Sequence, residues 1–166
     1  MNTKGDFWND RNRELPNEEK ISQWVATNLG GEVTSRPTGY FKEYDFGVTV
    51  NGREITYELK TDYYSCDSWD ALGGGYIFLE TGCNKKDSAI LTTEADNWLY
   101  YLPNRHQIIG FKPEKMLAYV SGHYCRQQYN VGKKNADGKF IGNANGLLIP
   151  QEVSGMSWLK IKNYYG

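Results

Sequence analysis

The first clear pattern along the chain is a stripe of apolar residues at helical spacing, which predicts a helix over 18–29. The stripe consists of Ile21, Trp24, Val25 and Leu29. Pro16 stands where a first helical residue is favoured, and Gly30-Gly31 ends the pattern. The polar stretch before this helix has no usable period, so we expect residues 1–16 to form an arm.

Three runs that alternate apolar and polar residues follow the helix and predict β-strands. They cover 32–36, 44–50 and 54–61. Asn51-Gly52 joins the last two runs, and this pair between alternating segments is a strong signal of a β-hairpin. Because side chains alternate across a strand, Glu58 and Lys60 are expected on one face, with Tyr57 and Leu59 on the other.

The second half of the chain mixes strands with short helices and polar loops. Apolar runs predict strands over 76–81, 108–111 and 146–149, and residues 98–102 are also apolar. A short helix is expected near 88–91, with capping-box spacing at Thr93 and Asp96, and another is opened by Pro113. We expect loops over 62–75 and 126–146, and a C-terminal tail around Trp158. The basic stretch 126–146 has the Gly, Asn and Lys content of a loop kept for function.

Length and composition limit the class of protein. A chain of 166 residues fits one domain, and 14% aromatic residues supply large side chains for a core. No apolar run approaches the length needed to cross a bilayer, and the first residues lack the apolar stretch of a secretory signal. We therefore expect a single cytoplasmic domain over 1–166 that has no membrane partner.

The cysteines exclude a disulfide framework, because the chain has only three, at wide spacings and without a Cys-x-x-Cys pair. They are Cys66, Cys83 and Cys125. A zinc site that combines them with His123 can be drawn, but its spacing matches no common structural site. Buried thiols are the favoured interpretation.

Charge is divided unevenly along the chain. Residues 1–100 carry 10 Lys and Arg against 17 Asp and Glu, whereas residues 101–166 carry 9 against 3. An acidic cluster beside a basic surface suits a site that holds a divalent cation and a phosphate backbone together. The alternative is a globular surface on which charges are simply scattered.

Candidate chemistry lies on the predicted hairpin. Hairpin pairing brings Asp45 on one strand to within about 5 Å of the strand that carries Glu58. Two carboxylates there can share a hard cation such as Mg²⁺, with the backbone carbonyl of Leu59 as a further oxygen ligand. Lys60 follows on the same face as Glu58, where its ammonium can hold a phosphate or orient a water. Glu18 lies near the inward stripe of the first helix and is a third candidate acid.

These residues resemble the PD-(D/E)XK nucleases, whose signature is an acid on one strand followed by (D/E)-x-K on the next. Asp45, Glu58 and Lys60 match that signature, Glu18 matches an upstream helical Glu, and Tyr44 replaces the Pro that often precedes the first acid. Four further stretches look like small phage-encoded members of this superfamily. They are 60–62, 77–80, 92–98 and 146–150. The resemblance covers roughly 18–150.

The resemblance implies an α/β fold with a restriction-endonuclease-like αβββαβ core, in which helices flank a central mixed sheet. It also implies a Mg²⁺-dependent DNA endonuclease in which Mn²⁺ can substitute, acting in the host cytoplasm if phage-encoded. Asp45, Glu58 and the Leu59 carbonyl would hold the metal, while Lys60 and Glu18 would assist catalysis. No recognition domain is visible, so structure-selective, resolvase-like cutting is favoured and a second subunit, as a homodimer, is an option.

Several alternatives stay open for these acids and for the aromatic residues. Asp45 and Glu58 could be surface residues paired with Lys60 or Arg53, and Glu18 could be a first-turn acid favoured by the helix dipole. Glu80 either supports the site, as a partner of the metal or of Lys60, or is an edge residue of its strand. The aromatic cluster is expected in the core rather than as a base-stacking platform. It comprises Trp98, Tyr100 and Tyr101.

The basic residues also have two interpretations. Lys133, Lys134 and Lys139 either contact phosphates or belong to a solvated loop, and Arg105 is a further DNA-binding candidate. The second function considered for the whole chain is a nucleic-acid-binding or inhibitory module that keeps the nuclease fold without cleaving. Three charged residues converging on one point disfavour it, because binding alone has no chemical need for them.

Overall fold

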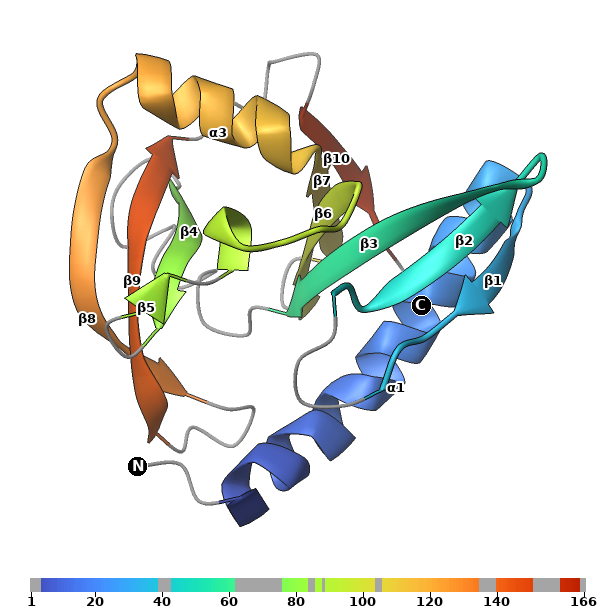
Figure 1. Ribbon diagram of the computed structural model, residues 1–166, viewed down its shortest axis with the longest axis horizontal. Helices are drawn as coiled ribbons and strands as arrows, with labels where there is room; N and C mark the ends of the chain where they lie inside the picture. Colours follow the sequence, from blue (N-terminus) through green and yellow to red (C-terminus); the bar gives the residue numbers. More distant parts are fainter. Residues whose placement is uncertain are drawn as a thin grey trace.

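The computed structural model of the chain describes residues 4–38, 43–61, 76–83, 86–87, 89–103, 106–134, 140–150 and 159–164. Figure 1 shows its helices and strands. In the first half these are α1 (Lys4–Leu29), β1 (Glu32–Ser35), β2 (Phe46–Val50), β3 (Arg53–Thr61), β4 (Tyr76–Cys83), β5 (Lys86–Asp87) and the 3₁₀ turn η1 (Ala89–Leu91). They are followed by β6 (Asn97–Leu102), β7 (Gln107–Phe111), α3 (Pro113–Gly122), β8 (Arg126–Lys134), β9 (Phe140–Pro150) and β10 (Leu159–Asn163).

The described strands form two sheets. The central sheet has the order β1-β2-β3-β6-β7-β10, and a second sheet has the order β5-β4-β9-β8. Within the central sheet β3 and β6 are parallel, whereas the other neighbours are antiparallel. The expected α/β fold with a central mixed sheet is thus confirmed.

The hairpin that carries the candidate chemistry forms as predicted. Asn51 and Gly52 have φ values of 51° and 77°, the left-handed conformation that a tight two-residue turn between twisted strands requires. The turn sets the register of β2 against β3, in which Phe46 faces Tyr57 and Val48 faces Ile55. This register fixes the side of the sheet on which each β3 residue lies.

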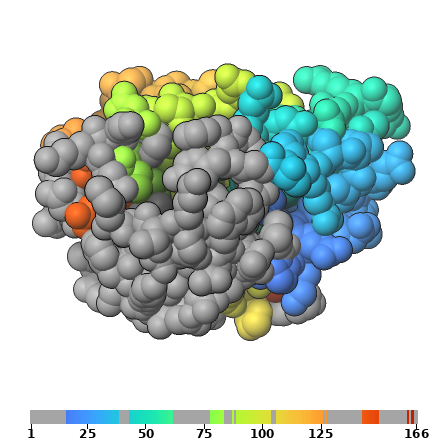
Figure 2. Space-filling view, turned by 60° about the horizontal axis from the view of Figure 1, so that its bottom comes forward, coloured from blue at the N-terminus to red at the C-terminus, as the bar shows by residue number. Residues whose placement is uncertain are grey.

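One face of the central sheet is covered by α1. Ile21, Val25 and Ala26 are buried against residues of β2, β3 and β6. The buried strand residues in this cluster include Phe46, Val48, Tyr57, Leu59 and Leu99. Figure 2 shows α1 and the first three strands, in blue to blue-green, together on one side of the molecule. Glu58 and Lys60 therefore lie on the opposite face of the sheet.

The opposite face of the central sheet packs against the second sheet and α3. Trp98, Tyr100 and Phe111 on the central sheet form a core with Met116 of α3 and Leu79 of β4. Trp98 is fully buried and Tyr100 is 4% exposed. Their predicted place in the core is confirmed, and Tyr101 is half-buried against Tyr164.

The helix α1 starts earlier than the sequence indicates. Residues 4–16 are helical instead of forming an arm, and Pro16 lies inside the helix. Proline removes one helical hydrogen bond, but the backbone bonds of the turns on both sides are enough to continue the helix. Periodicity misses this segment because it detects only an apolar face, and residues 4–16 have no such repeat.

Two further expectations for the second half are wrong. The described residues of 126–146 do not form a basic loop, because β8 pairs there with β9 as antiparallel strands. The expected tail contains β10, which pairs with β7 at the edge of the central sheet. Few apolar residues mark the strand β8, whereas in β10 the residues Leu159 and Ile161 alternate with lysines, a short strand period that the expectation of a tail overlooked.

The order of elements departs from αβββαβ after β3. Among the described residues between β3 and β6 there is no α-helix: the chain forms β4, β5 and the single turn η1. The capping-box spacing at Thr93 and Asp96 opens no helix, since Thr93 Oγ1 accepts a hydrogen bond from the Ala95 N–H in a local turn. The chain opens in the expected order, with one helix followed by three strands.

Candidate active site

Asp45 is buried at the start of β2 and is fixed by two backbone contacts. Its N–H donates to the carbonyl of Tyr57 at 2.9 Å, and its carboxylate Oδ2 accepts from the Leu59 N–H at 2.6 Å. Only 6% of Asp45 is exposed. A buried carboxylate held in this way is not a solvated surface residue, so the surface interpretation of Asp45 is excluded.

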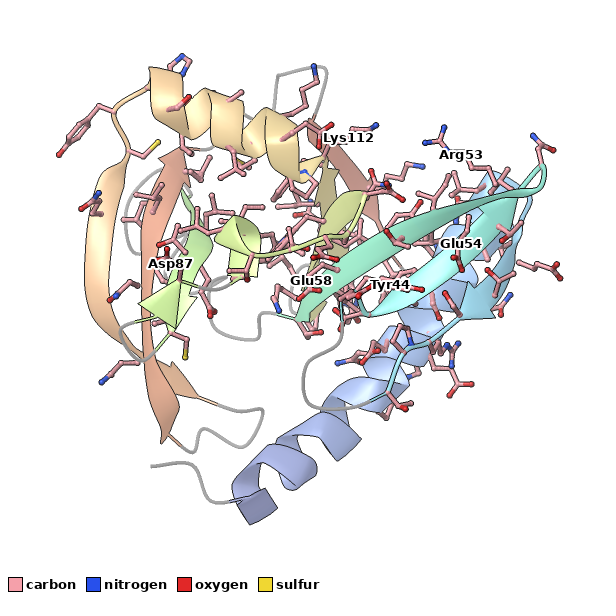
Figure 3. The ribbon with its side chains drawn as sticks, in the orientation of Figure 1. Tyr44, Arg53, Glu54, Glu58, Asp87 and Lys112 are labelled. Carbon is pink, nitrogen blue, oxygen red and sulfur yellow. The ribbon has the colours of Figure 1, made fainter. Side chains whose placement is uncertain are left out.

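Glu58 and Lys60 lie side by side near the carboxyl end of β3. Lys60 Nζ donates to Glu58 Oε1 at 2.5 Å, and the side chains are 36% and 15% exposed, respectively. Figure 3 shows Glu58 at this end of the strand, away from Arg53 near the turn. Arg53 is therefore not the partner of Glu58, and the expected common face of Glu58 and Lys60 is confirmed.

Three carboxylates act on the ammonium of Lys60. Burial by itself lowers the pKa of Lys60, but the negative charges of Glu58, then Asp45, and more weakly Glu80 raise it, with a net upward shift. Glu58 contacts Lys60 directly, whereas Asp45 and Glu80 act on it through their charges, and we call these four residues the acidic cluster. Its formal charge is negative, because three carboxylates surround one ammonium.

Trp98 lies beneath Lys60 and was not predicted to have this position. Lys60 Nζ is 5.5 Å from the centre of the Trp98 ring, within the range of a cation–π contact. The parallel register places Trp98 beside Glu58, and the ring also stacks on Phe111. The sequence contains no signal for this contact, because it depends on which strand pairs with β3.

A hydrogen-bonded clamp holds β3 against the entry to β6. Asp96 Oδ2 accepts from the Thr56 N–H at 2.9 Å and from Thr56 Oγ1 at 3.1 Å, and the Asp96 N–H donates to Thr56 Oγ1 at 3.0 Å. Burial and the charge of Asp96 raise the pKa of Tyr57 to about 12. The clamp fixes the parallel register that places Trp98 under Lys60.

Glu18 and Glu19 differ in burial as their helical phase predicts. Glu18 is half-buried in α1, whereas Glu19 is exposed with a side-chain exposure of 73% and lies 3.9 Å from Arg36. The turn that follows Glu18 is packed on the sheet through Ile21 and Ser22, both fully buried. A role of Glu18 at the acidic cluster stays a prediction.

The DNA-binding candidates fall largely outside the described residues. Lys139 and Arg105 are not described, and for Lys133 and Lys134 only the backbone is described, within β8. In that strand Lys133 pairs with Gly142 and Lys134 with Phe140. Phosphate contacts by these residues stay predictions.

The donor set of the acidic cluster fits a hard divalent cation better than a soft one. Asp45 and Glu58 bring carboxylate oxygens to adjacent strands, and Leu59, between Glu58 and Lys60, has its backbone carbonyl in the same segment. In the described part of the chain no three His, Cys, Asp or Glu side chains form a preassembled metal site. Asp45, Glu58 and the Leu59 carbonyl are the groups that could hold Mg²⁺ here, with water as the further ligands.

The zinc alternative has no support among the described residues. Cys83 and Cys125 are free and half-buried, and burial raises the pKa of the Cys125 thiol. His123 stacks on Tyr119, with its Nδ1 2.9 Å from the Tyr119 carbonyl. Cys66 lies outside the described residues.

Comparisons with known proteins leave the geometry of the acidic cluster as the main guide to function. No family model, curated protein or solved structure matches this chain. Within the described residues, neither helix is long and apolar enough to span a membrane. Any functional assignment must therefore come from the residues themselves.

Proposed function

We propose that this chain is a metal-dependent DNA endonuclease of the PD-(D/E)XK type, which hydrolyses phosphodiester bonds. The observation that carries the proposal is the acidic cluster: a buried Asp45 just before β2 is bonded to the backbone of β3 at Leu59, between a half-buried Glu58 and the Lys60 that pairs with it. Burial of charged groups is costly unless they are used or well paired. A surplus of carboxylates around one ammonium fits a site made for a divalent cation.

Each residue of the cluster has a separate task in this proposal. Asp45 and Glu58, with the Leu59 carbonyl, hold Mg²⁺ or Mn²⁺, which when bound lowers the pKa of a water and offsets charge on the phosphate. The Leu59 N–H orients Asp45 Oδ2, so the backbone of β3 positions both acids. Glu80 reinforces the positive state of Lys60 from the second sheet.

Lys60 binds and orients the phosphate rather than accepting a proton. The neighbouring carboxylates favour its charged form, and an ammonium has three donors but no acceptor. Donation to a non-bridging phosphate oxygen stabilises the negative charge that grows there as the water attacks. The face of the Trp98 ring attracts this ammonium and so restricts the positions that the Lys60 side chain adopts.

Substrate selection would rest on the shape of the DNA. No separate recognition domain is evident in the sequence, so the favoured substrate is a branched or distorted DNA recognised by shape, with a homodimer as one arrangement. The polar hairpin β8–β9 carries Lys133 and Lys134 and is the proposed place of phosphate contacts.

A cleavage assay tests the proposal against a module that binds DNA without cutting it. Purified protein is incubated with supercoiled plasmid, a four-way junction and a matched linear duplex, with Mg²⁺, Mn²⁺ or EDTA. We expect cleavage with either metal and none with EDTA, with the junction cut faster than the duplex. A matched Asp45→Asn variant excludes a contaminating nuclease, since it should be inactive in the same preparation. Binding without cleavage in every metal condition would support the binding module.

A further inference from the structure

An apolar cavity lies on the face of the central sheet that is turned away from Lys60. Its volume is about 360 Å³, and it opens between the carboxyl-terminal half of α1, the sheet and the start of α3. Trp24 and Leu29 of α1 form one wall, and Tyr57, Leu99 and Ile108 form the floor. Gly110 helps to keep the space open, because a Cβ there would lie 3.1 Å from Leu99 Cδ2.

Three lysines surround this apolar cavity. Lys112 and Lys115 come from the start of α3 and Lys162 from β10, and all three are exposed. Lys162 Nζ lies 5.9 Å from the centre of the Trp24 ring. The described lining contains no Asp or Glu to balance these charges. Figure 3 shows Lys112 where β7 leads into α3.

We propose that this cavity is a binding site for a small anion with a flat aromatic body, such as an aromatic carboxylate, sulfonate or phosphate ester. The aromatic side chains of Trp24 and Tyr57 suit a ring, and the lysines at the opening suit an anionic group. A volume of this size lies within the range of small-molecule sites. The proposal does not depend on the endonuclease activity.

A DNA duplex fits these observations less well than a small anion. A duplex backbone can contact the lysines, but it offers no apolar group that would fill a cavity of about 360 Å³. Leu29 is 42% exposed at the wall of the cavity, which leaves apolar surface in contact with water until a ligand covers it. A ligand with both an apolar ring and a negative charge satisfies both features.

Calorimetric titration of the full chain tests the proposal with two probes of similar shape. 8-Anilinonaphthalene-1-sulfonate carries the anionic group, and N-phenyl-1-naphthylamine lacks it. We expect one saturable site for the sulfonate. Changing Lys112, Lys115 and Lys162 together to Gln should weaken the sulfonate at least about tenfold and the neutral amine less than about twofold, because only the charge contacts are lost.

Two further variants separate the cavity from the general surface. Leu29→Trp should weaken the binding of both probes by narrowing the opening. Leu29 is partly exposed, so the fold should be retained, and a thermal melt checks this. Lys20→Gln is the control, since Lys20 is an exposed lysine outside the described lining of the cavity. Sulfonate binding that is non-saturable, or equal in the triple-lysine and Lys20 variants, would overturn the proposal. Competitive displacement by a short DNA duplex would also overturn it and assign the lysines to a DNA surface.

Discussion

Replacing Lys60 with Met should change metal binding and catalysis in opposite directions: the affinity for the metal should rise and the rate of cleavage should fall. Methionine keeps a long apolar side chain against Trp98 but removes the ammonium that contacts Glu58 at 2.5 Å. The fold should be retained, since the contacts of Lys60 with its strand neighbours are made by the backbone of β3. Cleavage should fall because the phosphate loses its charged donor.

The structure sets the expected sizes of the two effects. Loss of one donor aimed at developing charge costs about 100- to 1000-fold in the rate of the chemical step. Metal affinity should rise, because Glu58 loses a competing cation at its Oε1. A unit charge pair at 4 Å is worth about 4 kcal/mol at an effective dielectric constant of about 20. Lys60 is 36% exposed, so solvent screening reduces this to about 1–2 kcal/mol, or about five- to thirtyfold tighter Mg²⁺ binding.

Single-turnover cleavage at saturating DNA and Mg²⁺ measures the rate, and calorimetric titration with Mn²⁺ or Mg²⁺ measures the affinity. Lys20→Met is the matched control: Lys20 is exposed on α1, so its substitution should leave the cleavage rate and the metal affinity unchanged. Cleavage at the wild-type rate would remove Lys60 from the site. A parallel loss of metal affinity and activity would refute the electrostatic reasoning and point to a role of Lys60 in the fold.

Three further predictions follow from the same contacts. Glu58→Gln should weaken Mg²⁺ binding as well as turnover, because it removes a charged ligand, and an unchanged metal titration would show that Glu58 does not touch the metal. Glu18→Ala should reduce cleavage far more than Glu19→Ala, since only Glu18 is half-buried, and the reverse order would contradict the helical phase. The pKa of Tyr57 is raised from 10.0 to about 12, so the folded protein keeps the hydroxyl proton at a pH where the unfolded chain loses it. The stability linked to this proton is therefore complete below pH 10 and is lost as the pH rises through about 12. Tyr57→Phe should therefore flatten the decline in the free energy of unfolding over that range, and denaturant titrations with an unchanged decline would contradict the assignment.

Local signals explain which parts of the site are predictable from the sequence. The Asn51-Gly52 turn and the two-residue period of β3 determine the hairpin and the common face of Glu58 and Lys60 without information from elsewhere in the chain. Pairing between distant segments has no such signal. The parallel contact of β3 with β6 joins residues 40 positions apart, as in the Thr56–Asp96 clamp. From the sequence, Asp96 is expected in a helix capping box with Thr93 and not in this clamp.

The non-local pairings also decide how the candidate site is completed. Asp45 and Glu58 come from the hairpin, but Trp98 comes from β6 and Glu80 from the second sheet. The charge of Glu80 favours the charged form of Lys60, and Glu80 lies on β4 of the second sheet, which no local signal of the hairpin specifies. The hairpin alone would bring Asp45 and Glu58 close together. It would lack the Trp98 ring below Lys60 and the carboxylate of Glu80. A short signature of this kind occurs often by chance. The proposed site depends in addition on strand pairings that the signature does not encode.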